Sequence, residues 1–180
     1  QIVSSELALP IDQIAVLHSD TDSTLYDFTT AASRSTFHMG RALELAAQDI
    51  KRQLACIVSP IFKINPEECT FENQMVKHED QFPDGLSYRE VLFKQFETKG
   101  GNLIGRGMVK TSSTNDKGEL QYSAFWVAGA GAAEVEVDSQ TGDVKLIKYV
   151  ASADLGKAIN PMACHQQLRG AVVMGIGQAL

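Results

Sequence analysis

Residues 37–60, FHMGRALELAAQDIKRQLACIVSP, carry the strongest helical pattern in the chain. Apolar side chains recur there at intervals of three, four and seven, and charged or amide side chains fill the positions between them. A hydroxyl at Ser35 or Thr36 can accept an unpaired amide proton of a first helical turn, so either residue is expected to cap this helix. Because proline cannot donate a backbone hydrogen bond, the helix is expected to end before Pro60.

Weaker patterns lie on both sides of this helix. Before it, residues 1–9 read as the end of a helix that Pro10 interrupts, residues 14–20 (IAVLHSD) as a short strand, and residues 21–36 as a loop rich in Ser, Thr and Asp. After it, a strand is predicted at Thr70–Val76.

A second helix is predicted from Ser87 to about Thr98. Glu90 stands three residues after Ser87, which is the spacing of a reciprocal capping box. Gly100 and Gly101 are expected to stop this helix.

The periodicity then changes to one that favours strands. The predicted strands are Leu103–Val109, Tyr122–Val127, Ala132–Val137 and Val144–Val150. Val135 and Val137 alternate with glutamates, as in a half-buried strand. The turn sequence DSQTGD at residues 138–143 predicts a hairpin between the last two strands, and a final helix is expected after Pro161.

This order of elements predicts an α+β fold, with helices packed on an antiparallel or mixed sheet. The 180 residues suffice for one domain, or for a helix-rich lobe at 1–100 and a lobe at 101–180 with the hairpin and the last helix. The chain opens at Gln1 without a methionine and stops at Leu180 inside an apolar helix that has no stop signal. We therefore expect it to be a piece of a larger protein.

Composition narrows the class of protein. A net charge of −6 with dispersed lysines and arginines argues against nucleic-acid binding. No apolar run reaches the roughly 18–20 residues of a membrane span, and no signal-peptide pattern opens the chain, so a soluble chain is expected. The odd number of widely spaced cysteines favours reduced thiols and therefore a cytoplasmic location. Cys56, Cys69 and Cys164 are widely spaced, and the four histidines lack metal-ligand spacing, so no metal ligands are expected from this chain.

The first candidate site is TTAASRST at residues 29–36, directly before the long helix. Small side chains there let backbone amides approach a ligand, and Ser33 and Ser35 add hydroxyl groups. A helix N-terminus also favours an anion such as phosphate. A Ser/Thr-rich capping loop is the commoner role of such a sequence, and local physics leaves both alternatives open.

The second candidate site is DLGKAINP at residues 154–161 and the helix after it, which carries Gln166 and Gln167. A side-chain amide donates and accepts hydrogen bonds, as a pterin edge or a metal-oxo group requires. Alternatively, Gln167 is simply solvated. The stretch GAGAAE at residues 129–134 lacks the third glycine of a dinucleotide-binding turn and leads into a strand, so a Rossmann-type oxidoreductase is not supported.

Two blocks of sequence resemble a known family. The first runs from DTD (20–22) through TAASRSTFHMG (30–40) into the long helix. The second runs from AEVEVD (133–138) through DLG, AINP and QLRG to GIGQAL (175–180). Both resemble, in the same order, segments of the molybdopterin-binding large subunit of the xanthine dehydrogenase, aldehyde oxidase and aerobic CO dehydrogenase family. The resemblance is weakest over residues 60–125.

The resemblance implies a fragment of a molybdopterin-binding domain, whose cofactor carries molybdenum and is often a cytosine dinucleotide in bacteria. By position, four residues of the first block would contact the pterin or its phosphate: Ala31, Ala32, Ser33 and Ser35. Gln167 would bond the pterin near the metal. We add Arg34 as a phosphate partner, because a guanidinium binds phosphate bidentately.

The resemblance also implies a parent enzyme that hydroxylates an aldehyde or an N-heteroaromatic substrate with oxygen from water. The Gly-x-Gly-Glu segment of the catalytic glutamate and the Gly-Gly-Phe-Gly-Gly cofactor loop do not occur in residues 1–180. The glutamate is therefore expected beyond residue 180, and this piece alone is expected to be inactive. Partners carrying [2Fe-2S] clusters and FAD are implied, in an oligomeric complex. The alternative is a non-catalytic binding or assembly module that retains the fold.

Overall fold

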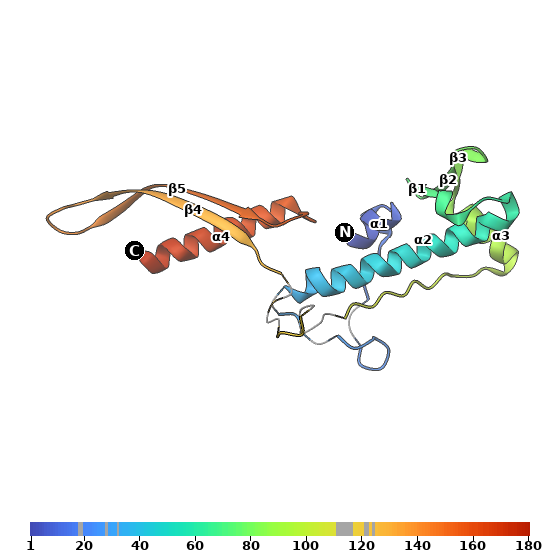
Figure 1. Cartoon of the computed structure of the whole chain (residues 1–180), viewed down its shortest axis with the longest axis horizontal. Helices are drawn as coiled ribbons and strands as arrows, with labels where there is room; N and C mark the ends of the chain where they lie inside the picture. Colours follow the sequence, from blue (N-terminus) through green and yellow to red (C-terminus); the bar gives the residue numbers. More distant parts are fainter. Residues whose placement is uncertain (18–19, 28, 32, 111–116, 121–122, 124) are drawn as a thin grey trace. The chain divides into compact units, whose positions relative to one another are not determined.

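The structure is a computed structural model that describes residues 1–17, 20–27, 29–31, 33–110, 117–120, 123 and 125–180. The chain divides into two compact units, Gln1–Lys110 and Thr111–Leu180. The boundary follows Lys110, whereas the sequence suggested a division after Gly100. Helices accompany one three-stranded and one two-stranded antiparallel sheet, which confirms the α+β class (Figure 1).

The first unit is built on the long helix α2 (Gly40–Phe62), against which the short helix α1 (Ile2–Leu7) packs (Figure 1). Its hydrophobic core lies at the C-terminal half of α2, where apolar side chains meet a small sheet and a second helix. The buried members of this core are Leu54, Val58, Val76, Phe82 and Val91. The core therefore lies away from the loop that precedes α2.

The end of α2 differs from the prediction, because the helix continues through Pro60 to Phe62. Lys63 then adopts a left-handed conformation, and its N–H group donates to the carbonyl of Ser59. The Phe62 ring packs against the Phe82 ring at a centroid distance of 4.8 Å. We attribute the extra turn to this packing, which offsets the one backbone hydrogen bond that Pro60 cannot donate.

The beginning of α2 also differs from the prediction. Ser35 and Thr36 lie inside a π-helical turn, η2 (Ser35–Met39), which runs directly into α2. Arg34 is the N-cap residue, and no side chain caps the turn. The N–H group of Phe37 already donates to the carbonyl of Ser33 at 3.1 Å, so the helical turn begins before the two hydroxyl residues. The predicted capping role of Ser35 or Thr36 is therefore wrong.

A three-stranded meander follows α2, in the order β1 (Thr70–Glu72), β2 (Met75–His78) and β3 (Phe82–Ser87). The sequence favoured one strand over residues 70–76, whereas the structure has two. Asn73 and Gln74 both have positive φ, 48° and 64°, and so form the two-residue turn that a tight hairpin requires.

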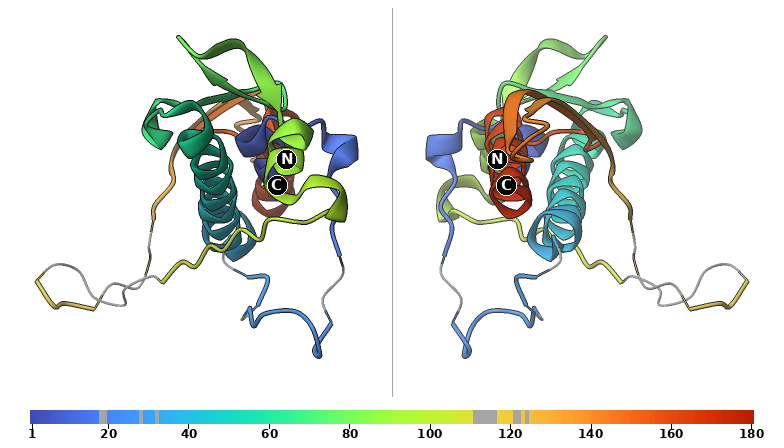
Figure 2. Two further views of the ribbon diagram at one scale, coloured as in Figure 1. Left: turned by 90° about the vertical axis from the view of Figure 1, so that its right-hand side faces the viewer. Right: turned by 90° about the vertical axis from the view of Figure 1, so that its left-hand side faces the viewer.

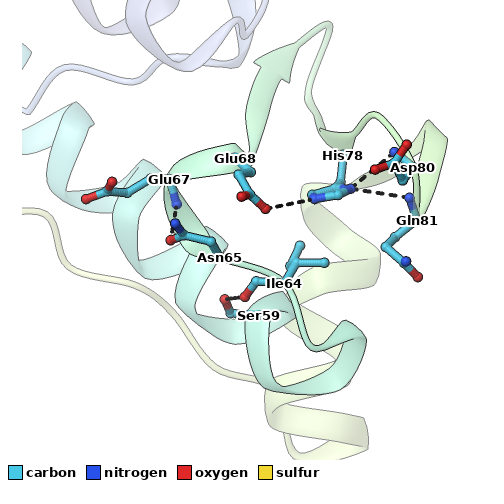
Figure 3. A network of polar contacts seen from close by, with 8 residues as sticks. All are labelled: Ser59, Ile64, Asn65, Glu67, Glu68, His78, Asp80 and Gln81. Carbon is cyan, nitrogen blue, oxygen red and sulfur yellow. Dashed lines mark hydrogen bonds and ion pairs between the residues drawn. The ribbon is translucent and has the colours of Figure 1, made fainter.

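The buried ring of His78 closes the turn between β2 and β3 (Figure 3). Its Nδ1 atom accepts hydrogen bonds from the backbone N–H groups of Asp80 and Gln81, each at 3.3 Å. Its Nε2 atom lies 3.3 Å from a carboxylate oxygen of Glu68. Because Nδ1 acts as the acceptor of these two bonds, Nε2 is the ring atom that donates a hydrogen bond to Glu68.

Helix α3 (Tyr88–Phe96) confirms the predicted capping box. The Ser87 hydroxyl accepts a hydrogen bond from the N–H group of Glu90 at 3.2 Å, and the Glu90 carboxylate accepts one from the N–H group of Ser87 at 2.7 Å. A short 3-10 turn, η4 (Glu97–Lys99), ends at Gly100, whose φ is 71°. The predicted stop at the glycine pair is confirmed.

Residues 103–109, here called the strap, are extended but pair with no strand in the described part of the chain, so the strand predicted there is wrong. The strap runs along α2 instead (Figure 1). The side-chain amide of Gln53 donates to the carbonyl of Ile104 at 3.0 Å, and the carboxylate of Asp49 accepts from the N–H group of Arg106 at 3.1 Å. Every second strap residue, from Leu103 to Val109, is half-buried.

Two further predicted strands fail. Residues 14–17 and 20 form no strand, and no strand of the described residues pairs with them. Val16 and Leu17 are accordingly 85% and 88% exposed. Residues 18–19 of the same prediction lie outside the described residues. Phe125–Val127 also form no strand, and residues 122 and 124 of the same prediction lie outside the described residues.

The second unit contains the predicted hairpin and final helix. Strands β4 (Ala128–Val137) and β5 (Val144–Asp154) pair antiparallel, and α4 spans Pro161–Ala179. Gly142 supplies the turn with a φ of 80° and donates to the carbonyl of Asp138 at 2.8 Å. Val135 and Val137 are 48% and 56% exposed, so the predicted half-burial of this strand is not produced by the described residues.

Candidate cofactor-binding site

The first candidate site is the end of an open loop that returns to the start of α2 (Figure 2). Its described residues between 20 and 31 are exposed. Asp20 organises the first part of the loop, because its carboxylate accepts the N–H group of Asp22 at 2.9 Å and its carbonyl accepts the Thr24 hydroxyl at 2.6 Å. The loop thus has local structure of its own while its surface stays open to a ligand.

A turn at Ser33 joins this loop to the helix. Ser33 has a φ of 61°, a left-handed conformation that is uncommon for a residue other than glycine. The N–H group of Arg34 donates to the carbonyl of Ala31 at 3.0 Å. Residues held in such conformations cluster at ligand sites. The side chains of Ala31, Ser33 and Ser35 are exposed around the turn, and Ala32 lies outside the described residues.

The guanidinium group of Arg34 is held by a carboxylate of the same loop. Its Nη2 atom lies 2.7 Å from an oxygen of Asp27, and the two side chains are 29% and 37% exposed. Sequence reasoning identified Arg34 but not Asp27. An ion pair between residues seven positions apart in an irregular loop has no periodic signal, so only the folded loop shows it.

These groups suit an anion. Two exposed hydroxyl residues, Ser33 and Ser35, flank a guanidinium group at the point where the chain enters α2. Hydroxyl groups donate to anionic oxygens, a guanidinium donates to two oxygens at once, and a helix N-terminus adds partial positive charge. The donor set therefore matches a phosphate group.

The second candidate site lies at the start of α4. Asp154 accepts the N–H group of Gly156 at 3.0 Å, and Asn160 caps α4 by accepting the N–H group of Ala163 at 3.0 Å. Gln167 follows in the second turn of the helix and is exposed. Its amide is therefore accessible for hydrogen bonding.

An apolar groove of about 600 Å³ lies between α4 and the β4–β5 hairpin within this unit. One face of α4 lines it, at helical spacing: Leu168, Ala171, Val172, Gly175, Ile176 and Ala179. Gln167 does not line the groove. Gly175 thus lies on the apolar face of α4 that lines the groove, whereas Gln167 does not lie on that face.

The structure brings Ala31, Ser33, Arg34 and Ser35 together in the first unit and places Gln167 in the second. The joining of these two sets into one cofactor site therefore stays a prediction. Within the described residues, no group of three His, Cys, Asp or Glu side chains could hold a metal ion. None of the described helices is both long and apolar enough to cross a membrane.

The described residues form a structure of the mixed α+β class, and the turn before α2 carries donor groups that suit an anion. The family model described as "Molybdopterin cofactor-binding domain" matches residues 1–180, and the chain belongs to this family. The resemblance drawn from the two sequence blocks is therefore confirmed.

Three similar proteins illustrate the relationship. The 6-hydroxypseudooxynicotine dehydrogenase complex subunit gamma of Paenarthrobacter nicotinovorans is 28% identical over 189 residues, which cover 100% of this chain and 22% of that protein. Aldehyde oxidase 2 of Cavia porcellus is 29% identical over 177 residues, which cover 98% of this chain and 12% of that protein. The crystal structure of quinoline 2-oxidoreductase from Pseudomonas putida 86 has the same fold, with a TM-score of 0.75 at 22% identity. The matched region covers 98% of this chain and 22% of that chain. The chain spans 22% or less of the length of each.

Proposed function

We propose that this chain contributes the phosphate-binding side of the cofactor site in the molybdopterin-binding subunit of a molybdenum hydroxylase. The observation that carries the proposal is the turn before α2, where Ser33, Arg34 and Ser35 stand together at the entrance to the helix. The family match over the whole chain makes molybdopterin the natural anion for this turn.

Each residue has a distinct role in this proposal. Ala31 and Ala32 are small enough for a pterin or phosphate group to approach the backbone. The hydroxyl groups of Ser33 and Ser35 donate to phosphate oxygens, and the guanidinium of Arg34 neutralises their charge. Gln167 donates to and accepts from the pterin near the metal. When bound, the molybdenum cofactor supplies the electron sink and activates the water-derived oxygen.

The proposed parent enzyme hydroxylates an aldehyde or an N-heteroaromatic substrate, with water as the oxygen source. Relatives named as an aldehyde oxidase and as a dehydrogenase complex subunit support an oxidoreductase that works with partners. We propose that these partners are subunits or domains carrying [2Fe-2S] clusters and FAD, in a cytoplasmic oligomeric complex. The catalytic glutamate then lies outside these 180 residues, which alone do not turn over substrate.

The test is the cofactor content of the whole protein, purified as the wild type and as the variants Arg34→Gln and Gln167→Ala. Arg89→Gln is the matched control, since Arg89 is an exposed arginine on α3 and its replacement also removes one positive charge. Molybdenum is measured by mass spectrometry and the pterin by its fluorescent oxidation product. Release of cytidine monophosphate reports the dinucleotide form.

We expect Arg89→Gln to contain as much molybdenum and as much pterin as the wild type. Arg34→Gln and Gln167→Ala should contain less of both. Equal cofactor content in all four proteins would contradict the residue assignments while leaving the cofactor function intact. A wild-type protein without molybdenum or pterin would contradict the function itself and favour a non-catalytic module.

A further inference from the structure

The loop that carries the proposed phosphate site has an unexpected charge. Residues 20–36 contain three aspartates, Asp20, Asp22 and Asp27, and one arginine, Arg34. The described loop is therefore net negative, although the ligand proposed for it is an anion. The arginine that should attract this ligand is already engaged by one of the aspartates, at 2.7 Å.

We propose that Asp27 is a positioning residue that holds the Arg34 guanidinium by its ion pair and that a phosphate-bearing ligand must displace it. This inference rests on the proposed function of the turn at residues 31–35. The Asp27 carboxylate and a phosphate group recognise the same feature of Arg34, its planar fork of N–H donors, so they compete for it. We call this Arg34–Asp27 ion pair the latch, because a phosphate group can displace the carboxylate and the pair can form again when the phosphate leaves.

The geometry makes such an exchange feasible. Both side chains are partly exposed, at 29% and 37%, so water and salt screen the pair and it contributes little to stability. A phosphate group carries more charge than one carboxylate and offers more acceptor oxygens. It can therefore take over the guanidinium, while Asp27 turns toward water.

The latch also gives Asp27 two effects of opposite direction. It keeps Arg34 beside the turn, which favours binding, and it repels the incoming anion, which opposes binding. Because the pair is solvent-accessible, we expect the competition to outweigh the orienting effect. Replacing Asp27 by asparagine then tightens phosphate binding about three- to tenfold at low ionic strength, and added salt reduces this gain.

The test is a titration of the full 180-residue chain with inorganic pyrophosphate and with inorganic phosphate, followed by NMR. The signals are the backbone amides of the loop and the Nε–H group of Arg34. The variants are Asp27→Asn, Arg34→Gln and the double variant. Asp22→Asn is the matched control, because it removes one negative charge from the same loop at a residue whose N–H group bonds to the carboxylate of Asp20. Asp27→Glu restores the carboxylate.

We expect Asp27→Asn to bind pyrophosphate several-fold more tightly than the wild type, and Asp27→Glu to stay close to the wild type. Asp22→Asn should show a clearly smaller gain than Asp27→Asn. The double variant should bind as weakly as Arg34→Gln, because without the guanidinium Asp27 has nothing to withhold from the ligand.

Three results overturn the latch. If Asp27→Asn and Asp22→Asn gain equally, the effect is loop charge alone. If Asp27→Asn binds no better than the wild type while Arg34→Gln abolishes binding, the phosphate site stands and the latch does not. If no protein shows binding that depends on Arg34, both the latch and the proposed role of Arg34 fall.

Discussion

Replacing Gly107 by alanine tests how the strap is attached to α2. A Cβ atom at Gly107 would overlap the carbonyl oxygen of Ala42 and lie 2.6 Å from the backbone nitrogen of Ala46. A Cβ atom at Gly105 would likewise overlap the carbonyl oxygen of Ala46. These neighbours are helix backbone, which cannot rotate away as a side chain can, so the strap itself must move.

We work the expected cost of Gly107→Ala from the contacts that this movement breaks. Overpacking of a tight contact costs about 1–3 kcal/mol. Loss of the hydrogen bond from the Gln53 amide to the Ile104 carbonyl adds about 0.5–1.5 kcal/mol. We therefore expect the free energy of unfolding, measured by urea titration, to fall by about 1.5–4.5 kcal/mol. Hydrogen exchange at the Arg106 amide should accelerate as well.

The same variant has a pH signature. In the wild type, the hydrogen bond from the Arg106 N–H group, followed by the one from Arg52, holds the pKa of Asp49 below its ordinary value. A lowered pKa gives stability that is present above the ordinary aspartate pKa, about 4, and lost as the pH falls through the folded-state value. Gly107→Ala removes the larger cause, so its stability should depend less on pH below about pH 4 than that of the wild type.

Gly170→Ala is the control, because nothing lies within 4 Å of the added Cβ atom and helical alanine is intrinsically favoured. It should leave the stability unchanged or raise it slightly. The reasoning is refuted if Gly107→Ala unfolds at the urea concentration of the wild type with the Arg106 amide still protected.

Two further changes test local interactions. His78→Ala removes the acceptor of the backbone N–H groups of Asp80 and Gln81, so we expect the free energy of unfolding in urea to fall by about 1–3 kcal/mol, at about 0.5–1.5 kcal/mol per hydrogen bond. The Asp80 amide should exchange faster, and the exposed His165→Ala is a neutral control. Ser87→Ala removes the cap of α3 and should cost about 1 kcal/mol. In the wild type, hydrogen bonds from the Ser87 hydroxyl and from the Ser87 N–H group hold the pKa of Glu90 below its ordinary value. In Ser87→Ala this pKa should rise, which NMR titration of the Glu90 carboxyl measures. The stability that the lowered pKa provides above the ordinary glutamate pKa should then shrink.

The elements that could be predicted are those whose sequence signals lie within a few consecutive residues. The capping box of Ser87 and Glu90, the turn at Gly142 and the helix after Pro161 are each encoded within a few consecutive residues. Hydrogen bonds and φ preferences at this range do not depend on what packs around them. These elements were therefore predicted correctly from the sequence.

The strap shows where such reasoning stops. The sequence over residues 103–109 predicted a strand, and the structure has an extended segment there in which every second residue is half-buried. The sequence could not indicate the partner, because a period of two fixes which side chains share a face and not what that face meets. The glycines allow the backbone to lie directly on α2, so a helix takes the place that a neighbouring strand was expected to fill.

The candidate site also has features that the sequence predicted and features that only the structure shows. The sequence identified Ser33, Arg34 and Ser35 as small or donor residues before a helix, and the structure places them around one turn. Asp27 and the left-handed conformation of Ser33 were not predictable, since neither an ion pair across an irregular loop nor a strained dihedral angle leaves a sequence pattern.

By itself, then, the sequence determined the family, the helices with their own start and stop signals, and the chemical character of the loop before α2. The tertiary structure alone decided that α2 runs through Pro60, that the strap lies on a helix, and that Arg34 is held by Asp27. The physical reason is range: local signals act over about one helical turn, whereas packing and ion pairing join residues that the sequence separates.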